Sequence, residues 1–288
     1  YKQPIGDHMK RNLTPLLVFG AIAFLPRGAA ADVITDCTRV IRFLPVTINN
    51  PGTYCLERNE STSITSGAAI TVNANDVTID FKGHKIDGSG AGAGTLALGV
   101  SAVNRRGLTV RNGRIRGFLW GVQTSGTGTV VEDLSLDANT QGGINCDGTA
   151  CTVRRNSIWN SGGAVLPPPG VDSSYGIANY SDGGQTYDNT VSSFLNLANQ
   201  FPIAIQVGLG AGSIVRHNRV IGPGSGQGIG ISVANLGSGV LIAANEIVAF
   251  EKGIDGGINP STACRATSNR LFDIATPLLV CADAGDNN

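Results

Sequence analysis

The segment TVRRNSIWN, residues 152–160, places one asparagine between two short stretches in which apolar and polar residues alternate. Variants of it follow at 186 (TYDNTV), 214 (IVRHNRV), 241 (LIAANEI) and 265 (RATSNRL). Earlier copies, TVRNGRI at 109 and VVEDLSL at 130, place Gly113 and Leu134 in the asparagine position. Self-similarity at a regular spacing indicates a repeat protein.

An apolar anchor two positions after the asparagine position sets the spacing of the repeats. The anchors are Ile86, Ile115, Leu136, Ile158, Val191, Val220, Ile247 and Leu271. Each repeat also contains a second alternating segment, such as WGVQT, GGINC or YGIAN, separated from the first by loops of unequal length. Short alternating strands without a helical period predict a parallel β-solenoid with one coil per repeat, the coils stacking roughly 4.8 Å apart.

The repeated asparagines are predicted to serve the architecture. They are Asn156, Asn189, Asn218, Asn245 and Asn269. Asparagine tolerates the left-handed backbone of a sharp turn, and its amide can hydrogen-bond to the asparagine of the next coil. We therefore expect these residues to make the turns and to stack on one another.

Charged residues of the repeats are expected to form outward ladders. One column contains Lys82, Arg111, Glu132, Arg154, Tyr187 and Arg216, and the next contains Asp133, Arg155, Asp188 and His217. Opposite charges on adjacent strands contribute roughly 0.2–1 kcal/mol per pair. His217 beside Asp188 could instead be a base with its orienting carboxylate, but the columns contain no nucleophile, which favours the ladder.

The N-terminal residues are interpreted as a processing signal. From Met9 the chain has positive charges, an apolar run over 13–25 and small residues at 29–31, which together predict a secretory signal peptide over 9–31. Residues 1–8 precede Met9 and are interpreted as upstream sequence that does not belong to the fold. The mature chain is expected to be extracellular or periplasmic, with an N-terminal cap over 32–64 and a β-helix over 65–288.

All six cysteines follow the signal peptide, so an oxidising compartment can keep them paired. The nearest sequence neighbours are the preferred pairs: Cys37 with Cys55, Cys146 with Cys151, and Cys264 with Cys281. The alternative, a metal site, would need a tight cysteine or histidine cluster, and none is present.

The composition limits the kinds of partner that the chain is expected to bind. The chain has 288 residues with 40 glycines, 15% charged residues and a formal net charge of zero. Many glycines are typical of a β-rich protein with tight turns, and a neutral chain has no overall field that attracts nucleic acid or an anionic membrane. The sequence does not indicate an oligomeric state.

The opening DVTIDFKGHKIDGSG (76–90), the N-x-apolar turns and the G-I/V strands resemble secreted bacterial right-handed parallel β-helix proteins of the pectate-lyase-like superfamily. The resemblance covers about residues 65–283. It implies an all-β fold, a single right-handed parallel β-helix of about eight coils, whose N-terminal end is capped by the disulfide-closed segment. It is less specific for activity, because this architecture hosts polysaccharide lyases, glycoside hydrolases, epimerases, phage tailspikes and members without known activity.

A binding face is expected where the loops are longest, because insertions in solenoids project from one side. The longest loops, 160–175 and 192–201, lead into the G-I/V strands. The outward residues of those strands should form a polar row of Ser101, Gln123, Asn145, Ala178, Gln206, Ser232 and Asp255. Such a row can hydrogen-bond to sugar hydroxyls, and Tyr175, Tyr180 and Trp159 are near enough to supply apolar platforms, although packing is favoured for Trp159.

Carboxylates near this row are the catalytic candidates. Asp147 and Asp182 are expected at equivalent strand ends of neighbouring coils, and Asp172 lies in the longest loop. The competing interpretation is that CDG and SDGG are ordinary turn sequences. A lyase would instead use a basic residue near a group that neutralises a uronate, for which Lys252 beside Asp255 is the one combination on the row; calcium, which can serve as that group, is the one cofactor kept open.

Two functions therefore follow from the sequence. The preferred one is an extracellular polysaccharide-acting enzyme, a lyase or a glycoside hydrolase acting on an acidic or neutral glycan. The other is a non-catalytic β-helix that binds glycan or serves as a surface or matrix component. The superfamily resemblance favours the enzyme, whereas the lack of a clustered set of acidic and basic residues favours the binding protein.

Overall fold

The computed structural model describes residues 37–165, 173–195, 200–208, 211–224, 226–234, 238–257, 264–279 and 281–287. The chain divides into two units, 1–35 and 36–288, and all described residues belong to the second. The predictions for residues 1–8 and 9–31 therefore lie outside the described residues, as does Asp172.

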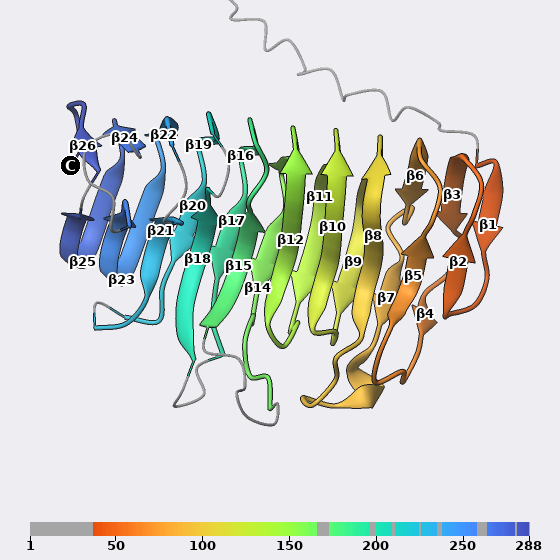
Figure 1. Ribbon diagram of the computed structural model, residues 1–288. Helices are drawn as coiled ribbons and strands as arrows, with labels where there is room; N and C mark the ends of the chain where they lie inside the picture. Colours follow the sequence, from red (N-terminus) through yellow and green to blue (C-terminus); the bar gives the residue numbers. More distant parts are fainter. Residues whose placement is uncertain are drawn as a thin grey trace, which may run out of the picture. The chain divides into compact units, whose positions relative to one another are not determined.

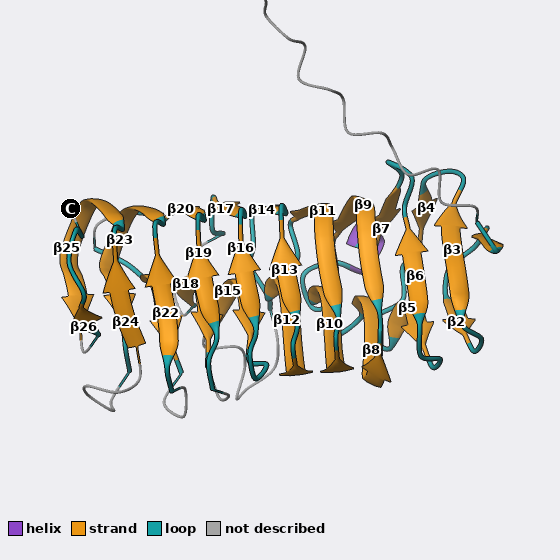
Figure 2. Cartoon of the chain, turned by 90° about the horizontal axis from the view of Figure 1, so that it is seen from above, coloured by secondary structure: helices purple, strands orange, loops and turns teal. Residues whose placement is uncertain are grey.

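The described chain is an all-β parallel β-helix (Figure 1). Its strands pair in parallel, coil on coil, from β1 at the red end to β25 at the blue end. Figure 2, turned by 90°, shows β13, β16, β19, β22 and β24 as one row of neighbouring strands. A short 3-10 turn, Ser89–Ala91, interrupts one loop. No helix within the described ranges is long and apolar enough to cross a membrane.

Each coil presents three faces. Face 1 contains β2 (Val46–Ile48), β5 (Ala68–Val72), β8 (Leu98–Arg106), β10 (Trp120–Thr127), β12 (Gly142–Thr149), β15 (Ser173–Asn179), β18 (Phe201–Val207) and β21 (Ile229–Val233). Face 2 contains β1 (Arg39–Ile41), β3 (Gly52–Leu56), β6 (Val77–Asp80), β13 (Thr152–Arg154), β16 (Gln185–Tyr187), β19 (Ile214–Arg216), β22 (Val240–Ala243), β24 (Cys264–Thr267) and β26 (Ala282–Asp283). Face 3 contains β4 (Glu60–Ser61), β7 (Lys85–Asp87), β14 (Ser157–Trp159), β17 (Thr190–Ser192) and β20 (Arg219–Ile221).

Four longer strands turn a corner. β9 (Thr109–Arg116) and β11 (Val130–Asp137) run from face 2 to face 3, and β23 (Glu246–Asp255) and β25 (Arg270–Leu279) run from face 3 to face 1.

The eight predicted anchors form one continuous column on face 3. Each anchor, from Ile86 to Leu271, is the Cα partner of the anchor in the next coil. The first seven are at most 1% exposed, and Leu271, in the last coil, packs partly buried against the same core. The repeat alignment is therefore confirmed, and it places one apolar side chain of each of these eight coils in the core; in the preceding coil, Glu60 is the partner of Ile86.

The asparagine ladder is confirmed. Asn156 Nδ2 donates to Asn189 Oδ1 at 3.0 Å, and the same bond links each asparagine to the next as far as Asn269. The ladder continues one coil beyond the prediction, because Asn269 Nδ2 donates to Asn287 Oδ1 at 2.9 Å.

The predicted position of the turn was wrong by one residue. The left-handed backbone belongs to the residue before each asparagine, such as Arg155 (φ 54°) and His217 (φ 53°). That residue points outward, so the buried asparagine that follows can bond the main-chain groups freed by the corner. Asn156 Nδ2, for example, donates to the Val131 carbonyl at 3.0 Å.

The charge ladders are present over the middle coils. Arg154 lies 2.6 Å from Glu132, and Arg155 lies 2.7 Å from Asp133. The expected place of Lys82 was wrong: Asp80 is the Cα partner of Arg111, because the first repeat contains two more residues between this position and its anchor.

Three disulfides join the predicted pairs, Cys37–Cys55, Cys146–Cys151 and Cys264–Cys281. The Cys37–Cys55 disulfide closes the N-terminal cap. The cap forms the first coil of the β-helix, since β2 pairs in parallel with β5 and β3 with β6.

Removing a disulfide should cost stability in proportion to the logarithm of the loop it closes. Cys37 and Cys55 are 18 residues apart, and Cys146 and Cys151 are 5 apart. Loop entropy predicts losses of roughly 3 and 2 kcal/mol for the two double Cys→Ser variants. Urea unfolding of both variants beside the wild type measures this. Equal losses, or a larger loss for the shorter loop, would contradict the entropic explanation.

Candidate functional site

The polar row is formed on face 1 in the register expected from the repeats. Each member, Ser101, Gln123, Asn145, Ala178, Gln206, Ser232 and Asp255, is the Cα partner of the next. Neighbouring positions such as Val122 and Thr124 are buried in the interior. The alternation therefore turns the row away from the interior. Ser101, Gln123, Asn145 and Gln206 are partly exposed, whereas Ala178, Ser232 and Asp255 are buried.

An aromatic pair lies beside the row. The rings of Trp120 and Tyr175 stack with centroids 5.6 Å apart and an interplanar angle of 23°. The strand between them contributes Gly142, and a Cβ at that position would lie 2.3 Å from Trp120 Cζ3. The missing side chain thus lets the indole lie across β12 and reach Tyr175. Trp120 Nε1 donates to Gln141 Oε1 at 2.9 Å, which fixes the ring.

Trp120 was not among the predicted site residues. The repeat alignment could have identified it. Trp120 of WGVQT and Tyr175 of YGIAN occupy the same position of their repeats, in the coils on either side of Gly142. Trp159, which was weighed as a platform, lies on face 3, where the Arg114 guanidinium is 6.0 Å from its ring centroid. It therefore belongs to a different face from Tyr175.

Tyr180 connects the aromatic pair to the polar row. Its hydroxyl donates to Gln206 Oε1. Burial raises the pKa of Tyr180, and the neighbouring Tyr175 and Asp147 raise it further. Tyr180 is therefore a protonated hydrogen-bond donor at neutral pH and not a base. We call Trp120, Tyr175, Tyr180 and Gln206 the tyrosine group.

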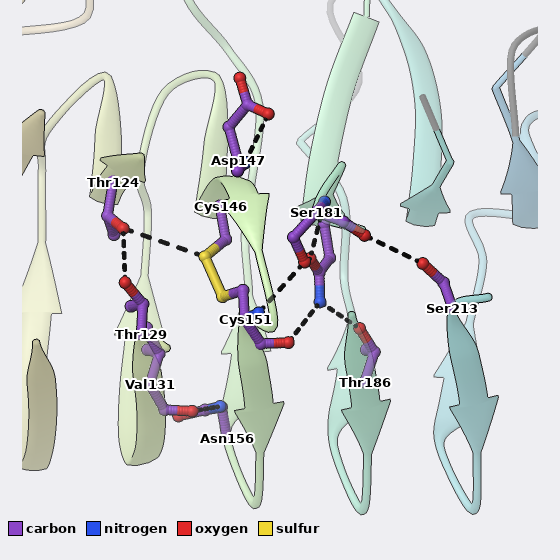
Figure 3. The surroundings of a disulfide bond; sticks show 12 residues. Thr124, Thr129, Val131, Cys146, Asp147, Cys151, Asn156, Ser181, Thr186 and Ser213 are labelled. Atoms are coloured by element: carbon purple, nitrogen blue, oxygen red, sulfur yellow. Dashed lines mark hydrogen bonds between the residues drawn. A yellow bond between two sulfur atoms is a disulfide. The ribbon is translucent and has the colours of Figure 1, made fainter. Parts of the chain in front are cut away.

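Asp147 is an exposed carboxylate beside this group. Figure 3 shows it pointing away from the Cys146–Cys151 disulfide, which lies beneath it. Cys146 is buried and faces inward, so the next residue must face out. The Tyr180 amide donates to the Cys146 carbonyl at 2.8 Å, which places Tyr180 alongside Asp147. Asp147 Oδ1 also accepts the amide of Gly148 at 2.7 Å.

Asp147 and Asp182 lie at the same ends of neighbouring coils, but not at equivalent positions. The bridge partner of Asp182 is Thr149, two residues beyond Asp147. The turns CDGTAC and NYSDGG are equally long, but aspartate is second in one and fourth in the other. Strand spacings place the two Cα atoms about 8 Å apart. Asp182 Oδ1 accepts the Ala211 amide at 2.8 Å, and its side chain is otherwise exposed.

Lys252 and Asp255 neutralise each other at the C-terminal end of the row. Lys252 Nζ lies 3.0 Å from Asp255 Oδ2, and Asp255 Oδ1 accepts the Gly257 amide at 3.0 Å. Lys252 Nζ is thus engaged by Asp255. Over the described ranges, no three histidine, cysteine, aspartate or glutamate side chains are grouped so that they could hold a metal ion.

A cleft that the sequence did not predict lies at the corner between faces 2 and 3. It has a volume of about 370 Å³ and is lined by His217, Asn218, Arg219, Ala244, Asn245, Glu246, Ser268 and Arg270. Arg219 and Glu246 form an ion pair at 2.9 Å across it. His217 Nδ1 is 3.7 Å from Asp188 Oδ1, so one end of a charge ladder lines this cleft. The cleft is on a different face from the polar row.

No family profile and no curated protein matches the sequence. Among solved structures, pectate lyase Pel9A matches with a TM-score of 0.54 and 13% identity, over 88% of this chain and 80% of the pectate lyase chain. The catalytic domain of a GH87 α-1,3-glucanase, in complex with tetrasaccharides, matches with a TM-score of 0.30 and 10% identity, over 84% and 64% of the two chains. At such identity the likeness to the pectate lyase shows the shared parallel β-helix fold alone.

Proposed function

We propose that the protein is a secreted polysaccharide-acting enzyme that binds its glycan on face 1, across the polar row and the tyrosine group. The observation that carries the proposal is the grouping on three adjacent coils of a stacked aromatic pair, a protonated phenol, uncharged amides and an exposed carboxylate. The partly exposed ring of Tyr175, which stacks on the buried Trp120, can bind the apolar face of a sugar. Amides and phenols bond sugar hydroxyls. The shared fold with a pectate lyase supports a polysaccharide as the substrate.

Three disulfides support secretion. All six cysteines are paired, and structural disulfides are formed and kept in oxidising compartments. A glycan outside the cytoplasm is the substrate that such an enzyme would meet.

The proposed catalytic groups are Asp147 and Asp182. Glycoside hydrolysis uses two carboxyl groups, one that protonates the leaving oxygen and one that activates water or attacks the sugar. A Cα separation of about 8 Å is compatible with the carboxyl spacing of inverting enzymes, roughly 6.5–9.5 Å. Asp147 is the stronger candidate because Tyr180 and the amides of the row adjoin it.

A polysaccharide panel tests the proposal. The mature protein is incubated with neutral and uronate-containing polysaccharides, and two products are followed: reducing ends and the ultraviolet absorbance of unsaturated sugars. We expect reducing ends to increase with at least one polysaccharide. Absorbance together with reducing ends would identify a lyase, and reducing ends alone a hydrolase. The absence of both products across the panel would contradict an enzymatic function.

One observation favours the second candidate, a non-catalytic glycan-binding protein. Both carboxylates accept main-chain hydrogen bonds of turns, Asp147 from Gly148 and Asp182 from Ala211, as turn aspartates commonly do. Binding of a panel polysaccharide that depends on Tyr175 but yields no product would establish this function instead.

A further inference from the structure

Resting on the proposed function, we infer that the glycan bound on face 1 is neutral and that the protein cleaves it by hydrolysis and not by β-elimination. The inference comes from the distribution of charge along the coils that form the tyrosine group and the longest loops.

The stretch of chain that forms the centre of face 1 has no basic residues. Residues 156–215 contain no lysine, arginine or histidine. They include the face 1 strands β15 and β18 and both of the longest loops. Because the whole segment lacks basic residues, neither of its long loops can bring a cationic side chain to the polar row.

The basic residues of the face 1 strands lie at its two ends and have partners. Arg105 Nη1 donates to the Asn73 carbonyl at 2.9 Å, and Arg106 lies 3.6 Å from Asp76. Lys252 is paired with Asp255 at 3.0 Å. The strands between them, β10, β12, β15, β18 and β21, contain no lysine or arginine.

A uronate carboxylate would be poorly accommodated on such a surface. It would lose hydration on binding and meet no protein cation, while the exposed Asp147 and Asp182 would repel it. Neutral sugar hydroxyls, in contrast, find donors and acceptors in Gln123, Asn145 and Tyr180. The electrostatics therefore select against polyuronates and leave neutral glycans as the fitting class.

The reaction type follows from the substrate class. β-Elimination removes a proton that is acidified by an adjacent carboxyl group, and a neutral sugar has no such group. Cleavage must then be hydrolysis: the anomeric C–O bond breaks, the oxygen of water bonds to the anomeric carbon, and the departing oxygen gains a proton. One water molecule is consumed, and no oxidant or metal is needed to balance the step.

Binding to matched polymers tests this inference. The probes are polygalacturonate and the same polymer after reduction of its carboxyl groups to primary alcohols, together with a neutral glucan, xylan and mannan. We expect a neutral polymer to bind at least about tenfold more tightly than any polyuronate and to release reducing ends without unsaturated products. Preferred binding of a polyuronate, or unsaturated products, would overturn the inference and leave the proposed function in place. If no polymer bound and none was cleaved, the proposed function would fall, and the inference with it.

Adding one cation to the row provides a second test. Asn145→Lys should strengthen polygalacturonate binding about two- to fivefold at low salt, the effect of an exposed ion pair. Thr190→Lys on face 3, in a neighbouring coil, is the matched control and should leave binding unchanged. An equal effect of both variants, or no effect of Asn145→Lys on binding of any probe, would show that the polar row is not the contact surface.

Discussion

Asp147→Asn is expected to lower turnover of the cleaved polysaccharide by about 10²–10⁴-fold, the contribution of a positioned proton transfer. The substitution keeps the size of the side chain and its hydrogen bond from Gly148 but removes the ionisable group. The melting temperature should hardly change, because exposed residues contribute little to folding. Initial rates of reducing-end release and a thermal melt of the same preparation measure both quantities.

Asp188→Asn is the matched control for this variant. Asp188 is also an exposed aspartate, but it lies at the corner between faces 2 and 3, where its left-handed backbone (φ 57°) suits asparagine. Its turnover should equal that of the wild type. Asp182→Asn should lose activity as Asp147→Asn does if the two form the carboxyl pair. Normal turnover of both would show that they are turn aspartates and would favour the binding protein.

The fold was predictable from the sequence because each coil of a solenoid uses the same pattern of strands and turns. The anchor residue of each coil packs on its equivalent one coil away, so an alignment of the sequence with itself also gives the spatial register. The polar row followed from the same alignment, since Gln123 and Asn145 are neighbours in the sheet for the reason that Ile115 and Leu136 are. Local disulfides were predictable from the short separations of the cysteines.

The details of the site were less predictable because they depend on single positions within turns and on side-chain volume. Asp147 and Asp182 occupy turns of equal length at different places, and this difference becomes apparent only when the strands on both sides are aligned. Trp120 reaches Tyr175 only because Gly142 has no side chain. Asn287 follows the last anchor by a different spacing, so the repeat pattern omitted it although it completes the ladder.

Asn218→Ala is expected to lower the free energy of unfolding by about 1–3 kcal/mol, the cost of leaving buried polar groups without partners. Asn218 is 1% exposed and lies in the middle of the ladder. Its Oδ1 accepts the amide and the Nδ2 of Asn189, each at 3.0 Å. Its Nδ2 donates to Asn245 Oδ1 at 3.0 Å and to the Thr186 carbonyl at 2.9 Å. Alanine satisfies none of these groups.

The end of the ladder supplies the control. Asn287 Oδ1 accepts a hydrogen bond from Asn269, but Asn287 Nδ2 does not donate to another asparagine of the described chain. Instead it donates to Asp283 Oδ1 at 2.6 Å and to the Ala266 carbonyl at 3.0 Å. Its groups are only partly buried, so Asn287→Ala should cost less, about 1 kcal/mol or below. Urea unfolding of the two variants and the wild type gives the order. The polar row is on another face, so folded Asn218→Ala should bind and cleave glycan like the wild type. If Asn218→Ala kept the unfolding midpoint of the wild type but lost activity, the ladder asparagine would take part in function. If Asn287→Ala lost more unfolding free energy than Asn218→Ala, stability would be concentrated at the C-terminal coil and not along the stacked amides.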